Sequence, residues 1–116
     1  MPRRAVAQAL IALTRNALEA SGPDSSVRVL GRQAGEYFQF IVTDHGKGMS
    51  PETLRRIGEP FFTTKEPGKG MGLGTFLVRT LAEQLGGHLT FESTPQTGTL
   101  ATFELPLFVN PVAHAE

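Results

Sequence analysis

The fold of this chain is set by the stretch FQFIVTDHGKG, residues 38–48. In its first half the apolar side chains Phe38, Phe40 and Val42 recur at every second position, as on the buried face of a β-strand. The alternation stops at Asp44, and Gly46 and Gly48 then interrupt regular structure. The sequence therefore predicts a strand over 38–42 that leads into Asp44 and a glycine-containing loop.

The segments before this stretch predict a helix and a partner strand. Val27 and Val29 alternate with polar residues, which predicts a strand joined to 38–42 through a turn at 31–35. Residues 4–21 are predicted to be helical because apolar side chains repeat at helical spacing until Gly22-Pro23 ends the run. These repeating side chains are Val6, Leu10, Leu13 and Ala17.

The segments after the stretch predict two helices, a long loop and a second hairpin. Ser50-Pro51 is an N-cap followed by proline, which predicts a short helix over 51–57. Prolines and alternating glycines then predict a mobile lid over about 58–72. A helix over 73–85 and strands over 88–94 and 99–107 follow. The predicted fold is α+β, a two-layer α/β sandwich in residues 1–108 with a tail at 109–116.

Length and composition exclude several kinds of function. The 116 residues suit one domain, and 40% hydrophobic with 19% charged residues is typical of a globular chain. Eleven basic and eleven acidic residues cancel, so we expect no nucleic-acid binding and no direct membrane contact. The lack of cysteine excludes a disulfide, a thiolate metal site and a cysteine nucleophile. No apolar run is long enough to span a bilayer, and a cytoplasmic chain is expected.

The glycine-rich stretch GKGMGLG, residues 68–74, is a candidate phosphate-binding segment. Backbone amides without side chains can surround phosphate oxygens, and the N-terminus of the following helix adds partial positive charge. The stretch is not a P-loop, because no Gly-Lys-[Ser/Thr] follows four variable residues, and no buried strand precedes it as in a Rossmann motif. A flexible linker is the alternative interpretation.

Asp44 and Asn16 are candidate ligand-binding side chains. Asp44 can accept a hydrogen bond from an exocyclic amine while the glycines let a flat ring lie against the backbone; an ordinary Asx-type turn is the alternative. Asn16 is a mid-helix residue flanked by Ala12 and Ala20, and its amide oxygen suits Mg²⁺. A solvent-facing asparagine is the alternative there.

Five segments stand in one fixed order: NALEA at 16–20, DHGKGM at 44–49, EPFFTTK at 59–65, GMGLG at 70–74 and Gly98-Thr99. Together they resemble the N, G1, F, G2 and G3 boxes of the histidine-kinase ATP-binding domain, within the larger GHKL family that includes gyrase, Hsp90 and MutL. The likeness across 58–87 is strongest to redox-responsive sensor kinases of the RegB/PrrB type. The resemblance implies the Bergerat fold, a mixed, mostly antiparallel sheet packed on three helices.

The resemblance also implies a role for each matching residue. Asp44 would bind the adenine amino group, with Thr99 supporting it directly or through water, and Asn16 would hold Mg²⁺. Phe61 and Phe62 would anchor the lid or meet the partner domain, and either Lys65 or Lys69 would neutralise the triphosphate. The implied ATP-binding set is Asn16, Asp44, Gly46, Gly48, Met49, Phe61, Thr64, Lys65, Lys69, Gly70, Met71, Gly72, Leu73, Gly74 and Thr99.

Two positions depart from the family patterns. Gyrase-type ATPases carry a catalytic glutamate one helical turn before the asparagine, where this chain has Ala12. No general base for a hydrolytic water is therefore evident. Histidine kinases often carry a basic residue three positions after the asparagine, where this chain has Glu19, so one phosphate contact is in doubt.

The resemblance implies a module that binds Mg-ATP and presents the γ-phosphate to a histidine on a separate dimerisation hairpin, with a response regulator downstream. None of His45, His88 and His114 is predicted to lie on a long amphipathic helix, so we expect the phosphoacceptor elsewhere. The isolated module is then expected to be a monomer, and the parent kinase is expected to be anchored in the bacterial inner membrane. The alternatives are a GHKL-type ATPase and a regulatory nucleotide-binding module without phosphotransfer.

Overall fold

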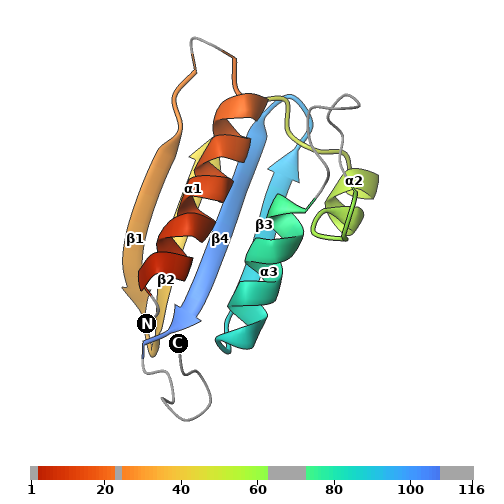
Figure 1. Cartoon of the computed structure of the whole chain (residues 1–116). Helices are drawn as coiled ribbons and strands as arrows, with labels where there is room; N and C mark the ends of the chain where they lie inside the picture. Colours follow the sequence, from red (N-terminus) through yellow and green to blue (C-terminus); the bar gives the residue numbers. More distant parts are fainter. Residues whose placement is uncertain (1–2, 23–24, 63–72, 108–116) are drawn as a thin grey trace.

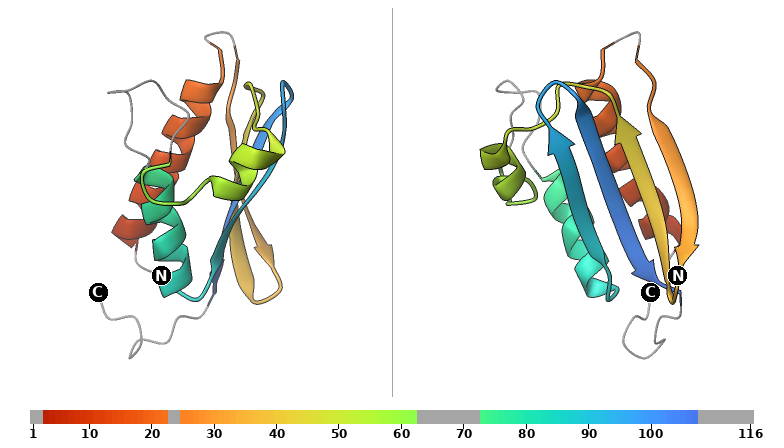
Figure 2. Two further views of the ribbon diagram at one scale, coloured as in Figure 1. Left: turned by 90° about the vertical axis from the view of Figure 1, so that its right-hand side faces the viewer. Right: turned by 180° about the vertical axis from the view of Figure 1, so that it is seen from behind.

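Four strands form one layer of the structure, and two long helices cover one face of that layer (Figures 1 and 2). The computed structural model describes residues 3–22, 25–62 and 73–107. This two-layer α+β architecture confirms the predicted fold class. The elements in chain order are α1 (Arg3–Ala20), β1 (Arg28–Ala34), β2 (Tyr37–Asp44), α2 (Pro51–Arg56), α3 (Gly74–Gln84), β3 (His88–Thr94) and β4 (Gly98–Pro106).

The strand order is β1-β2-β4-β3, and all three pairings between the described strands are antiparallel. The expectation of a mixed sheet is therefore wrong for the described part of the chain. Each hairpin supplies one antiparallel pair, and β4 returns between β2 and β3. This order places Thr99 of β4 opposite both Asp44 of β2 and Ser93 of β3.

The helices begin and end close to where the sequence predicts. Ser50 caps α2, since its Oγ accepts a hydrogen bond from the Thr53 backbone N–H at 3.1 Å. α1 and α3 cover the sheet side by side, whereas α2 lies beyond the β3 edge in both opposed views (Figures 1 and 2). No helix within the described ranges is long and apolar enough to cross a membrane.

The predicted turn at 31–35 is wrong. β1 continues through Ala34, with Gly31 paired to Phe40 in the middle of the ladder, and the turn falls at Gly35 and Glu36. Seven consecutive residues of β1 pair with β2, and this long-range pairing outweighs the weak strand preference of glycine.

The apolar core fills the space between the two helices and the sheet. Phe103 and Leu105 of β4 are completely buried there, with 0% of their surface exposed. Burial of side chains of this size stabilises the fold by about 1.5–3 kcal/mol each. The other buried apolar residues are Val6, Ala9, Leu13, Ala17, Val42, Val78, Ala82, Leu85 and Ala101. On the same face of the sheet, the core ends at the polar row of Asp44, Thr99 and Ser93.

Candidate functional site

Asp44 is a buried carboxylate at the end of β2, with 6% of its surface exposed. Its Oδ1 accepts hydrogen bonds from the backbone N–H of Gly46 at 2.9 Å and of Thr99 at 3.2 Å. The first bond is the Asx-type turn that the sequence offered as an alternative. The second ties the carboxylate to β4. Oδ2 makes no hydrogen bond within the described residues, which leaves an anionic acceptor for a ligand.

Gly46 and Gly48 are positions where backbone segments approach too closely for a side chain. A Cβ at Gly46 would overlap the carbonyl group of Ala20, at the C-terminal end of α1. A Cβ at Gly48, whose φ is +67°, would overlap the carbonyl of Thr94 at the end of β3. The loop after Asp44 is thus clamped between α1 and the β3–β4 hairpin, a structural role that the sequence did not predict for these glycines.

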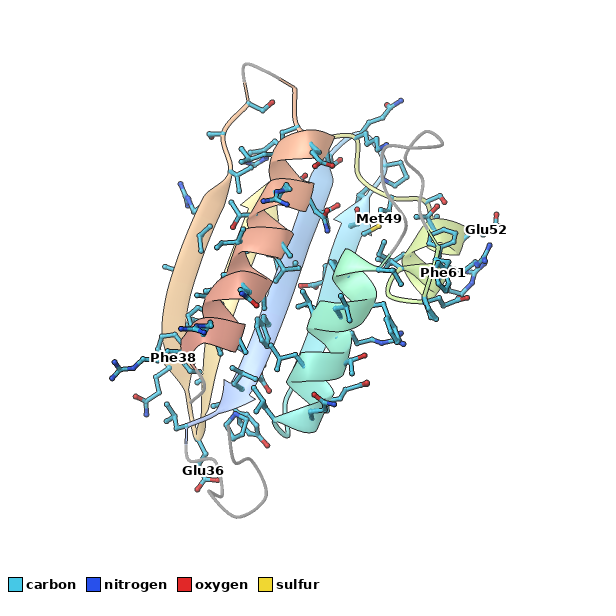
Figure 3. All side chains as sticks on the ribbon, in the orientation of Figure 1. Glu36, Phe38, Met49, Glu52 and Phe61 are labelled. Atoms are coloured by element: carbon cyan, nitrogen blue, oxygen red, sulfur yellow. The ribbon has the colours of Figure 1, made fainter. Side chains whose placement is uncertain are left out.

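Ser93 is a site residue that the sequence analysis missed. Its Oγ accepts a hydrogen bond from the Met49 backbone N–H at 2.8 Å and lies 2.8 Å from Thr99 Oγ1. Ser93 therefore connects the loop after β2 to β3 and β4, and Figure 3 shows Met49 beside β3. The predicted hairpin did not identify it, because a four-residue turn over 95–98 would pair residue 94 with residue 99. In the structure Thr94 pairs with Gly98, and this register places Ser93 opposite Thr99.

Asn16 lies in the contact between α1 and α3. Its Nδ2 donates a hydrogen bond to Oγ1 of Thr75, in the first turn of α3, at 3.3 Å. Asn16 precedes Ala20, the last residue of α1, by one helical turn. The loop after Asp44 packs against Ala20, so Asn16 and Asp44 both lie near the C-terminal end of α1. The alternative of an asparagine that faces only solvent is wrong.

The N-terminus of α3 has features that suit an anion. Leu73 is its N-cap residue and supplies no side-chain hydrogen bond, and a Cβ at Gly74 would meet no atom of the described residues within 4 Å. The first backbone N–H groups of a helix lack partners within the helix and carry partial positive charge. This end of α3 lies next to the Asn16 amide and therefore favours negative ligand groups there.

Most of the predicted lid lies outside the described residues, which include its first part up to Phe62. Phe61 lies on the surface beside α2 with 67% of its area exposed (Figure 3). Phe62 packs under the Arg56 guanidinium, whose carbon lies 4.4 Å from the ring centre. The predicted residues outside the described ranges are Thr64, Lys65, Lys69, Gly70, Met71 and Gly72, and the tail from 109 lies outside them too.

Ala12 precedes Asn16 by one turn of α1 and packs partly buried against the core. An apolar methyl group thus occupies the position from which a carboxylate would activate water in gyrase-type enzymes. The described part of the chain also contains no cluster of three or more metal-binding histidine, aspartate or glutamate side chains. The site is suited to binding and positioning a ligand, with no hydrolytic base at this position.

Comparison with known families agrees with this arrangement. Residues 2–109 match the family model described as histidine kinase-, DNA gyrase B- and HSP90-like ATPase. The chain belongs to this family. Its relatives place it with the ATP-binding catalytic domains of sensor histidine kinases within that family, as the resemblance predicted, whereas the RegB/PrrB-type subgroup stays a prediction.

Sensor histidine kinase ZraS of Klebsiella oxytoca is 41% identical over 101 residues, which are 86% of this chain and 21% of that protein. Histidine protein kinase DivJ of Caulobacter vibrioides is 34% identical over 116 residues, 97% of this chain and 19% of its own length. The catalytic domain of histidine kinase ThkA superimposes with a TM-score of 0.80 at 30% identity, covering 97% of this chain and 72% of that one. This chain thus spans about a fifth of the length of these curated relatives.

Proposed function

We propose that this histidine-kinase catalytic module binds Mg²⁺-ATP and presents the γ-phosphate to a histidine imidazole on a separate helical hairpin. The observation that carries the proposal is the buried Asp44 carboxylate, which keeps one oxygen available at the end of β2, where the following loop packs against the C-terminal end of α1. Asn16 lies one turn before that end of α1 and contacts the first turn of α3. A relative of the same fold, ShkA, was solved in complex with AMPPNP, with a TM-score of 0.79 and 26% identity to this chain.

The base is recognised at the end of β2. Asp44 Oδ1 is held by two backbone N–H groups, so the carboxylate is fixed in direction. Oδ2 then accepts from the exocyclic amine of adenine, a hydrogen bond to a charged group that contributes about 1.5–3 kcal/mol. A 6-oxo purine would place an acceptor against this carboxylate and would bind more weakly.

The phosphates extend toward α3. The helix N-terminus favours their negative charge, and Asn16 supplies a hard oxygen ligand of the kind that Mg²⁺ accepts together with water and phosphate oxygens. Mg²⁺ held by Asn16 would neutralise charge on the phosphate groups. Lys65 or Lys69 of the lid adds positive charge to the same end of the nucleotide.

Phosphotransfer depends on positioning more than on activation. An imidazole is already a good nucleophile, so orientation and charge neutralisation supply most of the rate enhancement. The methyl group of Ala12 leaves water without a base at that position, which argues against the GHKL-type ATPase. A regulatory module without phosphotransfer would bind the same nucleotide and differ only when the hairpin is supplied.

The partners follow from the same assignment. The phosphoacceptor hairpin belongs to the parent kinase and also carries its dimer contact, so the isolated chain is a monomer. A response regulator receives the phosphoryl group from that hairpin. Anchoring in the bacterial inner membrane belongs to the parent, whose relatives are about four to five times as long as this chain.

Calorimetry with ATP, comparing the wild-type chain with Asp44→Asn, tests the proposal. The asparagine keeps an oxygen for the N–H groups of Gly46 and Thr99 but presents an NH₂ group to the adenine amine. We expect ATP affinity to fall about tenfold to a hundredfold, with little change in melting temperature. The matched control is Glu92→Gln, which removes an exposed carboxylate from β3. Equal ATP affinity in the wild-type chain and Asp44→Asn would refute the proposal.

A further inference from the structure

The hydroxyl of Ser93 has every hydrogen-bonding position filled by protein groups. Its Oγ accepts a hydrogen bond from the Met49 backbone N–H at 2.8 Å. The same oxygen lies 2.9 Å from the carbonyl oxygen of Gly98 and 2.8 Å from Thr99 Oγ1. A serine hydroxyl has one proton to donate and two lone pairs. Its three contacts therefore use its complete hydrogen-bonding capacity.

The distribution of protons among these contacts follows from their chemistry. A carbonyl oxygen only accepts, so the Ser93 proton points to Gly98. The backbone N–H of Met49 only donates, so it occupies one lone pair of Ser93. The contact with Thr99 then requires the Thr99 proton, because Ser93 has none left. Thr99 is thereby fixed as a donor to Ser93, and toward any ligand its Oγ1 offers lone pairs alone.

We propose that Ser93 is a positioning residue that sets the polarity of the purine site by holding the Thr99 hydroxyl proton. This inference rests on the proposed nucleotide function. The backbone N–H of Thr99 bonds to Asp44 Oδ1, so Thr99 Oγ1 and Asp44 belong to one connected network. With Ser93 in place, both groups present acceptors toward the edge of the base.

Two acceptors at this edge distinguish purines by the substituent at C6. The amino group of adenine supplies donors to such a site, whereas the C6 oxygen of hypoxanthine supplies a further acceptor and is repelled. Without Ser93, the Thr99 hydroxyl is free to turn and donate to that oxygen. Loss of the Ser93 hydroxyl should therefore improve relative binding of the 6-oxo nucleotide, in addition to any general loosening of the loop.

The test measures ATP and inosine triphosphate affinities by calorimetry for the wild-type chain and variants. We expect Ser93→Ala to lower the ATP-to-ITP affinity ratio about fivefold, the value of one neutral hydrogen bond. Thr99→Val should lower it similarly, and adding Ser93→Ala to Thr99→Val should leave the ratio where Thr99→Val put it. Ser93→Thr retains a hydroxyl on the strand and should restore the ratio. Thr90→Ala, an exposed hydroxyl of the same strand, is the matched control.

The outcomes separate the two proposals. If Ser93→Ala weakens ATP and ITP by the same factor, Ser93 only supports the loop and the positioning role is refuted, while the nucleotide function stands. If Ser93→Ala changes the ratio equally in the wild-type and Thr99→Val backgrounds, Ser93 acts independently of Thr99 and the inference is also refuted. A wild-type chain that binds neither nucleotide overturns the proposed function and this inference with it. Should Ser93→Ala unfold, Ser93→Thr and Thr99→Val decide the question, since a positioning role requires an unchanged ratio in the first and a lowered ratio in the second.

Discussion

Asp44 shows how one side chain can stabilise the fold and remain able to bind a ligand. Burying a carboxylate is costly unless hydrogen bonds compensate it. Here two backbone N–H groups bond to one oxygen, and the second oxygen is left without a bond among the described residues. Both donors come from segments that must be brought together, the loop at Gly46 and the strand at Thr99. The Asp44 carboxylate can therefore make both hydrogen bonds only when β2, β4 and the loop are assembled.

Gly48 should be the most sensitive glycine of this loop. Alanine there requires a positive φ and places its Cβ against the Thr94 carbonyl, so either the loop or the β3–β4 hairpin must move. We expect Gly48→Ala to lower the free energy of unfolding by about 2–3 kcal/mol, measured by urea denaturation. Gly22→Ala is the control, since a Cβ there meets no atom of the described ranges within 4 Å. Equal stability of the two variants would show that the loop is not clamped.

The helices and most strands could be predicted because their signals are local. Apolar side chains at helical spacing mark α1, and the Ser50 cap with Pro51 marks the start of α2. The extent of β1 was missed because Gly31 suggests a turn until its pairing with Phe40 is known. The strand order β1-β2-β4-β3 could not be predicted from the sequence either, because it depends on contacts between residues far apart in the chain.

The candidate site, like the fold, was predicted only in part from the sequence. Motif resemblance selected Asp44, Asn16 and Thr99, whose side chains carry recognisable chemistry. It did not select Ser93, because a serine in an alternating strand has no distinct meaning until the strand register places it opposite Thr99. The structural use of Gly46 and Gly48 was likewise invisible, since it depends on the backbones of α1 and β3.

Variants in the contact between α1 and α3 can distinguish the proposed role of Asn16 in metal binding from its role in helix packing. Asn16→Ala removes both the amide oxygen and the hydrogen bond to Thr75. We expect the gain in ATP affinity on adding Mg²⁺ to fall roughly tenfold, about 1.4 kcal/mol, in calorimetry with and without EDTA. Thr75→Val removes the same hydrogen bond and leaves the amide, so its Mg²⁺ dependence should match the wild-type chain. A normal Mg²⁺ effect in Asn16→Ala would exclude Asn16 as the ligand.

His88 lies away from the end of the molecule where phosphate is expected. His88 begins β3, and Ser93 lies five residues further along the strand, which corresponds to roughly 17 Å at the usual rise. His45 follows Asp44 directly and is therefore beside the adenine end of the proposed site. His88 also follows the C-terminal end of α3, so the length of this 11-residue helix, about 16 Å at the usual rise, separates it from the α3 N-terminus, where the γ-phosphate should be presented.

The isolated chain is accordingly expected to bind ATP without phosphorylating itself. Incubation with γ-³²P-ATP and Mg²⁺ should leave the protein unlabelled, and phosphate release should stay at the background rate because Ala12 offers no base. Adding the parent's phosphoacceptor hairpin should produce labelled hairpin, and Asp44→Asn should reduce that label at sub-saturating ATP in proportion to its weaker ATP binding. Label on this chain in the absence of the hairpin would contradict the proposal that the phosphoacceptor histidine lies on the hairpin. Bound ATP with an unlabelled hairpin would instead favour a regulatory module, since positioning of the nucleotide would then serve no transfer.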